Sequence, residues 1–533
     1  MAADGRQTYP EAVNRLHLRR RGFAAAAPRS VRVIGRASDF VYRQGVLCSI
    51  NGSELSVITV SGPTNFAHTL DLAGFLPPNS PADQSTFVLL NYSEGVIVVR
   101  FFPQADSVSS QLVAIDVKSR AVKGTVLLHQ QCDELFVRHT ANFLYYGTHT
   151  GRGDHNHHEW VIQGVSLDPT HCFEVRPCVQ LRNFAGSDIG STVAFEIHDG
   201  YFYALSNQTS FDTEEVDWTS FYHCIRFPLH NPITSAIEGR RDIFRRQHEE
   251  GPLNDRWTDL GFQVDERTNK LLIVEARREW QAGSSAHVRR FYARKIQFRE
   301  DGEEPTPRQL HPTDPMGPLA GDSNNPHYAP SEPRNPKHVH LEYGFENDSA
   351  PSFILSRTKF RCYNWSCSAF LDVVEDPACC GGKYGQMCLR LRIGARIGSP
   401  RIPQDPLPEV NRSGPSPNII PLLPPKDSVQ PFRYEPIRMW PPPPTSSQAA
   451  AGVHVLLNPK PKTATSPYPV QMTTLCAADE RSIVIMRKPV RPKNKDDESG
   501  EIILVNFDPF DSFDPINRMK LAQNGSHGSD QAR

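Results

Sequence analysis

The densest group of chemically capable side chains lies in the stretch THTGRGDHNHHEW. Imidazole and carboxylate groups at this spacing could ligate Zn²⁺ or another transition metal. A structural zinc site usually draws its ligands from two elements, however, and this stretch reads as one loop. We therefore expect a solvated hairpin loop without a metal. The candidate ligands are His149, Asp154, His155, His157, His158 and Glu159.

A second candidate is a group of five cysteines late in the chain. Their C-x4-C…C-C…C spacing lacks the two C-x2-C knuckles that make a zinc ribbon specific. The first two also lie in strand-like sequence, where a free thiol acts as a small hydrophobic side chain. We expect free thiols and no metal site, which fits a reducing compartment and an odd total of 11 cysteines. The five are Cys362, Cys367, Cys379, Cys380 and Cys388.

The sequence carries none of the short motifs that mark common enzymes. There is no G-x-S-x-G, no GxxxxGK[ST] loop, no HExxH and no Rossmann fingerprint. Acid pairs such as Glu214–Glu215 and Glu249–Glu250 are adjacent on the chain. Paired carboxylates catalyse only when they face each other across a cleft, which adjacency does not provide. We predict no catalytic residue and no cofactor.

Aromatic and acidic residues alternate in FDTEEVDWTSFYHCIRFPL. Exposed aromatic side chains beside acids could form a patch that binds a basic peptide. The simpler interpretation is that Trp218 and Tyr222 pack between sheets. If a partner surface exists in this stretch, its residues are Phe211, Trp218, Phe221 and Tyr222, beside the acids Asp212, Glu214, Glu215 and Asp217.

The elements around these residues are β-rich segments broken by turns at a nearly constant step. Gly45, Gly95, Gly147 and Gly200 follow one another at steps of 50, 52 and 53 residues. A period of this size corresponds to one four-stranded propeller blade. A β-sandwich would explain any single window equally well, but the regular step favours an all-β, β-propeller-like fold of about seven blades. Such a fold most often provides a binding surface.

Composition divides the chain along its length. Residues 9–22, YPEAVNRLHLRRRG, read as a helix, and we expect its Arg19-Arg20-Arg21 run to be a solvated helix end. Two Pro-rich stretches without periodicity interrupt the strands, and the second ends in MWPPPP, which could bind SH3 or WW partners but is more simply a linker. The predicted order is N-terminal helix and linker 1–30, propeller 31–300, disordered insertion 301–336, propeller 337–398, Pro-rich linker 399–450, last blade or blades 451–513 and disordered tail 514–533.

Charge and hydropathy exclude several classes of protein. The 533 residues contain 58 Lys and Arg against 59 Asp and Glu, a net charge of -1. No global field therefore favours nucleic acid or an anionic membrane. No 18-residue apolar run and no secretory h-region is present. We expect a cytoplasmic and/or nuclear protein with neither nucleic acid nor a membrane as partner.

Several segments together resemble a large family of fungal F-box proteins. They occur in the same order as in that family, from about residue 9 to 510. They are LRRRGFAAAAPRSVRVIGRASDFVYRQGVLC (18–48), GSTVAFEIHDGYFYALSNQTSFDTEEVDWTSFYHCIRFPL (190–229), DRWTDLGFQVDERTNKLLIVEARREW (255–280), FILSRTKFRCYNW (353–365), CLRLRIGARIGSP (388–400), PIRMWPPP (436–443) and ADERSIVIM (478–486).

The resemblance implies a propeller-like substrate receptor of a cullin-type ubiquitin ligase, acting in ubiquitin-dependent degradation. In that family an N-terminal F-box docks on the Skp adaptor. The Leu-Pro-x-Glu-Ile pattern of the box is missing, and residues 1–21 match at most the helix that joins the box to the platform. Skp adaptor and cullin are therefore expected partners only if the ligase role survives without a visible box. The alternative is a propeller enzyme with a polar or metal site in its central channel.

Overall fold

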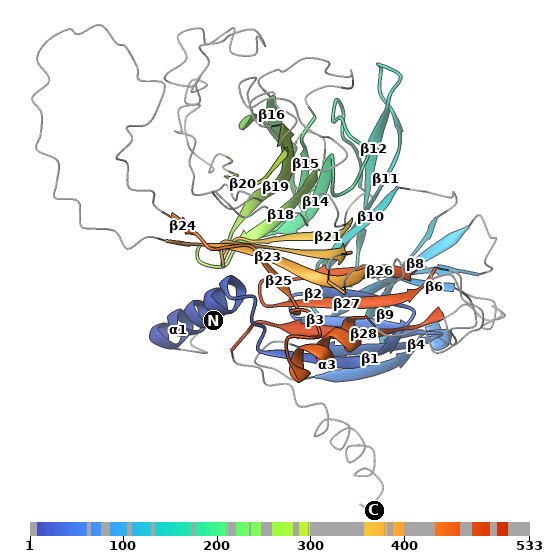
Figure 1. Ribbon diagram of the computed structural model, residues 1–533. Helices are drawn as coiled ribbons and strands as arrows, with labels where there is room; N and C mark the ends of the chain where they lie inside the picture. The colour runs from blue at the N-terminus through green and yellow to red at the C-terminus, as the bar shows by residue number, and fades with distance from the viewer. Residues whose placement is uncertain are drawn as a thin grey trace, which may run out of the picture.

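The structure, a computed structural model, is a ring of β-sheets with a helix at each of two places on its surface (Figure 1). It describes most of residues 8–509. The gaps are 61–65, 76–85, 104–108, 129–133, 172, 174–176, 209–210, 212–219, 234–235, 247–257, 281–286, 297, 299–356, 378, 381–386, 399–431, 459–471 and 491–497.

Seven antiparallel sheets follow one another along the chain, which confirms the predicted seven-bladed β-propeller. Blade 1 contains β2(Asp39–Arg43), β3(Val46–Asn51), β4(Glu54–Thr59) and β5(Ala67–Asp71), and blade 2 contains β6(Thr86–Ser93), β7(Val96–Phe102), β8(Ser110–Asp116) and β9(Ala121–Leu128). Blade 3 contains β10(Leu135–His139), β11(Phe143–Arg152), β12(His158–Ser166) and β13(Cys178–Gln180). Blade 4 contains β14(Val193–His198), β15(Tyr201–Ser206), β16(Ser220–Pro228) and β17(Glu238–Arg246).

The later blades are interrupted by the longest gaps. Blade 5 contains β18(Asp259–Asp265), β19(Lys270–Trp280) and β20(His287–Lys295); blade 6 contains β21(Arg357–Asn364), β22(Ala369–Asp376), β23(Cys388–Gly398), β24(Phe432–Tyr434) and β25(Arg438–Trp440); blade 7 contains β26(Met472–Ala478), β27(Ser482–Pro489), β28(Gly500–Asn506) and β1(Ser30–Ala37). The helices are α1(Tyr9–Ala24), α3(Gln448–Leu457) and the short 3₁₀ turns Leu72–Phe75 and Pro169–His171.

The ring closes by pairing the two ends of the described chain. Strand β1 lies antiparallel to β28, with Val31 opposite Val505 and Arg32 opposite Leu504. An early strand thus completes the blade that the last three strands begin. The fourth strand of the last blade therefore comes from the start of the described chain.

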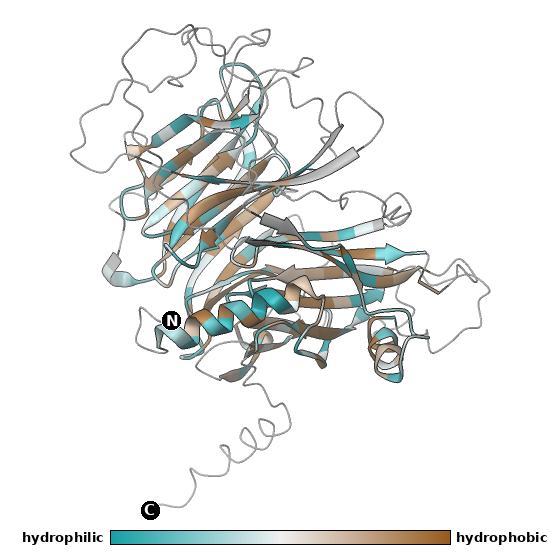
Figure 2. Cartoon of the chain, turned by 60° about the vertical axis from the view of Figure 1, so that its left-hand side comes forward, coloured by the Kyte–Doolittle hydropathy of each residue, from teal (hydrophilic) through white to brown (hydrophobic). Residues whose placement is uncertain are grey.

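Burial explains why the middle strands are hydrophobic without alternation. In β7, Val96 to Val99 are all buried. Ile97 and Val99 pack toward blade 1, whereas Val96 and Val98 pack toward blade 3. A middle strand therefore lies between two neighbouring sheets, and each of its faces contributes to a core. Figure 2 shows brown, hydrophobic residues running along many of the strands.

The glycine period has a local cause at three of its four positions. Gly45, Gly95 and Gly200 have φ of 76°, 83° and 77°, and the residue before each also has a positive φ. Two successive positive φ values are typical of the type I′ turn that joins the first two strands of a blade. The prediction of a turn is wrong for Gly147, which lies within β11. A Cβ at this position would come within 2.3 Å of the Phe136 ring.

The antiparallel order gives the ring two different faces. We call the end with the connections between first and second strands the turn face; the connections between third and fourth strands also lie there. The opposite end, which we call the loop face, carries the connections between second and third strands and those between blades. Helix α3 and the β11–β12 loop belong to the loop face.

One predicted boundary is wrong, and others lie outside the described residues. The expected linker 399–450 contains β24 and β25, both paired with β23, and the start of α3. Trp440 of MWPPPP packs against a core cluster. The predicted disordered segments 301–336 and 514–533 fall outside the described ranges. Within those ranges, no helix combines the length and apolar character needed to span a bilayer.

Candidate functional site

The β11–β12 loop is an ordered projection of the loop face. A Cβ on Gly153 would lie 2.5 Å from the His155 ring and 2.9 Å from a Glu159 oxygen, so a larger residue there would displace these side chains. Asn156 takes a positive φ of 65°, which asparagine tolerates. Backbone hydrogen bonds between Gly153 and both Asn156 and His157 close the loop.

Glu159 holds this loop from beneath. Its carboxylate is 1% exposed and accepts hydrogen bonds from Gln180 Nε2 at 2.6 Å and from the Asn183 backbone N–H at 2.6 Å. His155 Nε2 lies 3.1 Å from the same carboxylate. Burial alone would raise the pKa of Glu159, but these donors outweigh it and leave the pKa below its ordinary value. The loop is therefore fixed by an ionised carboxylate.

Phe211 completes a small aromatic surface on this loop. Its ring centroid lies 4.1 Å from that of His155 and 5.1 Å from that of His157, the latter pair stacked at 6°. Phe211 is partly buried, while Asp154, His157 and His158 are exposed. We call Phe211, His155 and His157 the aromatic patch. A rigid aromatic surface with polar edges is well suited to contact a peptide, because little side-chain freedom is lost on binding.

The four residues predicted to bind a partner do not form one surface. Tyr222 is fully buried in β16, and its hydroxyl donates to Glu275 at 2.5 Å, so it belongs to the core between blades 4 and 5. Phe221 is partly buried in the same strand, and Phe211 lies in the aromatic patch. Trp218 and the acids Asp212, Glu214, Glu215 and Asp217 lie outside the described residues.

The group around Glu275 is a buried ion network. Arg245 Nη2 lies 2.8 Å and Arg277 Nε 2.7 Å from the carboxylate, and Asn207 Nδ2 donates to it at 3.2 Å. Burial would raise the pKa of Glu275, but the two guanidinium groups hold it well below its ordinary value. Arg277 also stacks on Tyr292 at 3.8 Å. Every charge has a partner, so this network joins blades rather than offering a site.

A second polar group crosses the centre of the ring. The first strands of neighbouring blades contact one another and form its inner wall. Arg43 of blade 1 reaches Glu196 of blade 4 at 2.5 Å, and Arg138 of blade 3 lies 3.9 Å from the same carboxylate. Burial would raise the pKa of Glu196, but Arg43 and Arg138 lower it further than burial raises it. The charge of the Glu196 carboxylate is thus balanced by two guanidinium groups. It lies at the centre of the ring, which is where a channel enzyme would hold its reactive groups.

Helix α1 is fastened across the turn face. It begins with a capping box in which Thr8 and Glu11 exchange hydrogen bonds. Arg15 Nε donates to Asp508 at 2.8 Å, Arg19 Nη2 to Glu266 at 2.5 Å and Arg20 Nε to the Ser366 carbonyl at 2.8 Å. These partners lie on blades 7, 5 and 6, so one helix ties three blades together.

Burial of α1 overturns the expectation of a solvated arginine run. Arg19 is only 4% exposed, and Phe23 stacks on Phe507 with ring centroids 4.1 Å apart. Arg21 is exposed as expected. On the outer side of the helix, Tyr9 is 75% and Val13 50% exposed, four residues apart and therefore on the same face.

The five-cysteine group is divided by the fold. Cys367 packs in the core beside Phe23, and Cys362 lies on β21, as expected of small hydrophobic side chains. Cys379, Cys380 and Cys388 instead meet His454 of α3. Elsewhere in the described chain no other group of three such ligand atoms converges, the β11–β12 loop included. Sequence analysis missed His454 because it lies 74 residues from Cys380, beyond the Pro-rich stretch.

Comparison with protein-family models and with curated proteins finds no match. Among solved structures, the chain is similar to a prolyl endopeptidase (TM-score 0.36, 9% identity, 95% of this chain and 55% of that one). It is also similar to prolyl oligopeptidase B from Galerina marginata (TM-score 0.31, 8% identity, 89% of this chain and 57% of that one). A third similar structure is the WD40 domain of SCAP from fission yeast (TM-score 0.30, 8% identity, 87% of this chain and 82% of that one). The chain covers little more than half of either peptidase. At these scores the likenesses carry no argument about function, and the propeller itself rests on the seven sheets described here.

Proposed function

We propose that this chain is a non-catalytic protein-interaction platform resembling the substrate-receptor region of an F-box protein of a cullin-type ubiquitin ligase. In this proposal the loop face recruits the partner protein. Helix α1, on the turn face, holds a neighbouring component of the ligase in a fixed orientation. The observation that carries the proposal is the fastening of α1 to three blades through Arg15, Arg19 and Arg20.

Helix α1 is fastened by three arginine contacts in addition to the stacked Phe23. A receptor must hold its substrate at a defined distance and angle from the rest of a ligase. A helix with a buried arginine and a stacked phenylalanine at one end transmits orientation better than a flexible linker does. The exposed Tyr9 and Val13 leave an outer apolar stripe for the neighbouring component. This fits the family resemblance of YPEAVNRLHLRRR.

The centre of the ring favours a platform over an enzyme. Arg43 and Arg138 compensate Glu196 there, so these inner-strand charges stabilise the ring. The aromatic patch, by contrast, lies on the loop face with its polar edges exposed. We propose no intrinsic hydrolase or ligase chemistry, and any ubiquitin transfer would be carried out by partner subunits.

The test is affinity purification of the tagged chain from cells, with co-purified proteins identified by mass spectrometry. Recovery of the Skp adaptor and cullin supports the ligase role. Recovery of other partners without them supports a platform and contradicts the ligase role. Metal-dependent turnover of a substrate by the purified chain, abolished by a chelator, contradicts the non-catalytic proposal.

A further inference from the structure

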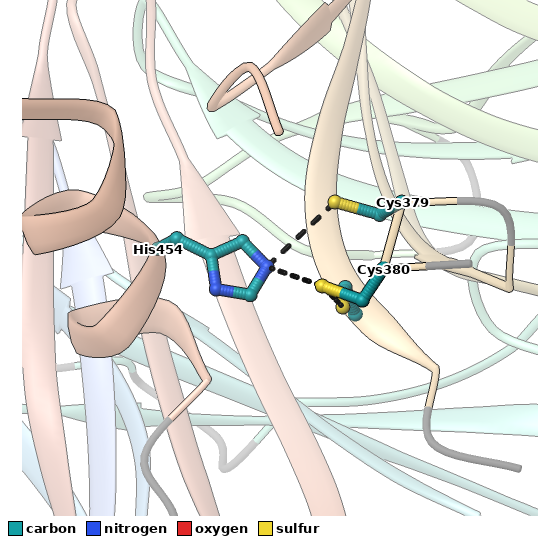
Figure 3. Close-up of side chains that lie close together, drawn as sticks. Cys379, Cys380 and His454 are labelled. Carbon is teal, nitrogen blue, oxygen red and sulfur yellow. Dashed lines mark hydrogen bonds between the residues drawn. The ribbon is translucent and has the colours of Figure 1, made fainter. Parts of the chain in front are cut away.

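Three cysteines and one histidine meet on the loop face between blade 6 and α3. Cys379 and Cys380 lie in the turn after β22, Cys388 is the first residue of β23, and His454 comes from α3. Figure 3 shows the His454 ring directed toward the sulfur atoms of Cys379 and Cys380. Thiol and imidazole side chains therefore join blade 6 to α3 at this point. As neutral groups, such side chains interact only weakly with one another.

The distances from His454 to two of the cysteines match those between ligands of one metal ion. His454 Nε2 lies 3.7 Å from Cys379 Sγ and 3.6 Å from Cys380 Sγ, and all four ligand atoms lie within 4.8 Å of one another. Zinc–sulfur bonds of about 2.3 Å and zinc–nitrogen bonds of about 2.0–2.1 Å, at tetrahedral angles, place sulfur and nitrogen about 3.6 Å apart and two sulfurs about 3.8 Å apart. The spacing to His454 agrees closely with this geometry.

The ligands are held in place by contacts outside the group. Asn458, one turn after His454, accepts from the Leu389 backbone N–H at 2.6 Å and donates to the Leu389 carbonyl at 3.2 Å. Leu389 directly follows Cys388, so this pair fixes α3 against the start of β23. Ser447 caps the other end of the helix. These contacts hold the segment that carries His454 against the segment that carries Cys388.

Helix α3 needs an anchor of this kind. It has 10 residues, and isolated helices shorter than about 12–15 residues are marginal in water. It follows a Pro-rich stretch and turns its buried side, Ala450, His454 and Leu457, toward the propeller. His454 is 9% exposed, Cys379 9% and Cys388 6%, whereas Cys380 is exposed and gives a route from solvent.

We propose that Cys379, Cys380, Cys388 and His454 form a structural Zn²⁺ site that fastens α3 to blade 6. Three thiolates and one imidazole complete a tetrahedral shell and leave no open position, which is the pattern of a structural rather than a catalytic zinc. Soft thiolate ligands with imidazole select zinc over magnesium or calcium. The site is independent of the proposed receptor function, although it would shape the loop face.

The competing arrangement is a disulfide between Cys380 and Cys388, whose sulfur atoms lie 3.2 Å apart. That bond would leave Cys379 and His454 without a common partner. It would also respond to reductant and not to metal. The two arrangements therefore differ in mass, in metal content and in redox response.

The first experiment measures metal bound to the full chain purified in reductant without chelator. We expect one zinc per chain by elemental analysis, and loss of most of it in Cys380→Ser and in His454→Ala. Cys178→Ser is the matched control, because Cys178 is also an exposed free cysteine but lies on β13. The control should keep its zinc. A wild-type chain without zinc that also fails to take up Co²⁺ overturns the proposal.

Cobalt gives a readout that does not depend on how much zinc survives purification. The chelator-treated, reduced chain titrated with Co²⁺ should develop the visible and near-ultraviolet bands of a tetrahedral thiolate site, and Zn²⁺ should abolish them. Zn²⁺ should also raise the melting temperature of the wild type and not that of Cys380→Ser. Because Cys380 is exposed, its substitution should leave the propeller folded, as circular dichroism will confirm. An intact mass showing a Cys380–Cys388 disulfide in the chain purified without reductant, together with no metal-dependent shift after reduction, overturns the proposal.

Discussion

Arg43 Nη2 lies 2.5 Å from Glu196 Oε1, although the two residues are 153 positions apart and belong to blades 1 and 4. These blades are not neighbours in the ring, so the contact crosses its centre. Arg43 also donates to Asn91 of blade 2 at 3.2 Å, and Arg138 of blade 3 approaches the same carboxylate. One glutamate thus connects inner strands that no hydrogen-bonded sheet connects.

Removing this central charge should destabilise the whole ring. We expect Glu196→Gln to lower the free energy of unfolding by about 2–3 kcal/mol, because two guanidinium groups lose a charged partner in a partly buried place. Urea denaturation measures the change. Asp242→Asn is the control, since its pair with Arg240 is exposed and should matter by about 1 kcal/mol or less. Equal effects of the two substitutions would show that the bridge does not hold the ring.

The network between blades 4 and 5 should be more sensitive still. Glu275→Gln keeps the shape of the side chain but leaves Arg245 and Arg277 buried beside a neutral amide. We expect a loss of about 3–5 kcal/mol, the usual consequence of leaving a buried charge without its partner. Thermal unfolding of the same Asp242→Asn control provides the comparison. An unchanged melting temperature for Glu275→Gln would mean that this carboxylate is not ionised in the folded chain.

Acid should weaken the fold through two buried histidines. Burial lowers the pKa of His139 to about 4 and of His223 to about 4, from 6.5. Between pH 6.5 and pH 4 the unfolded chain binds more protons than the folded chain. The contribution of the two neutral histidines to folding stability is therefore complete above pH 6.5 and is lost as the pH falls toward 4. Each group contributes up to about 3 kcal/mol.

The pH dependence can be assigned to a residue by substitution. His139→Gln should flatten the dependence of unfolding free energy on pH between 7 and 5, the range above most carboxylate titrations. The wild type, measured in parallel, is the reference. The assignment fails if the variant and the wild type show the same slope.

The fastening of α1 can be separated from its helix propensity. Arg19→Ala removes the ion pair between the buried Arg19 and Glu266, whereas Arg21→Ala changes an exposed neighbour in the same helix. Alanine favours helices, so neither substitution weakens the helix itself. Hydrogen exchange over residues 9–24 should accelerate several-fold in Arg19→Ala only. The same protection in both variants would show that Arg19 does not fasten α1.

Sequence periodicity predicted the blades because each blade needs a tight turn between its first two strands. Two strands must turn within a few residues, and glycine at positive φ does this at Gly45, Gly95 and Gly200. The period is a property of the repeat, so it persisted at Gly147, where glycine serves close packing against Phe136 instead. Local rules therefore gave the number of blades without giving the role of every glycine.

The candidate sites were harder to predict, because they depend on contacts between distant residues. Arg19 was expected at a solvated helix end, yet the fold buries its side chain and Glu266 binds its guanidinium group. His454 is a single histidine in an apolar helix, and only the fold brings it to the cysteines. A partner far along the chain leaves no local pattern to read.

The measurement that tests the platform most directly is recovery of co-purifying partners by variants of the loop face. Phe211→Ala removes the centre of the aromatic patch, while Phe102→Ala removes a partly buried phenylalanine on the same face in blade 2. We predict that Phe211→Ala loses at least one partner that the wild type and Phe102→Ala both retain, at an unchanged melting temperature. Equal recovery of all partners by the three proteins would contradict recruitment through the aromatic patch.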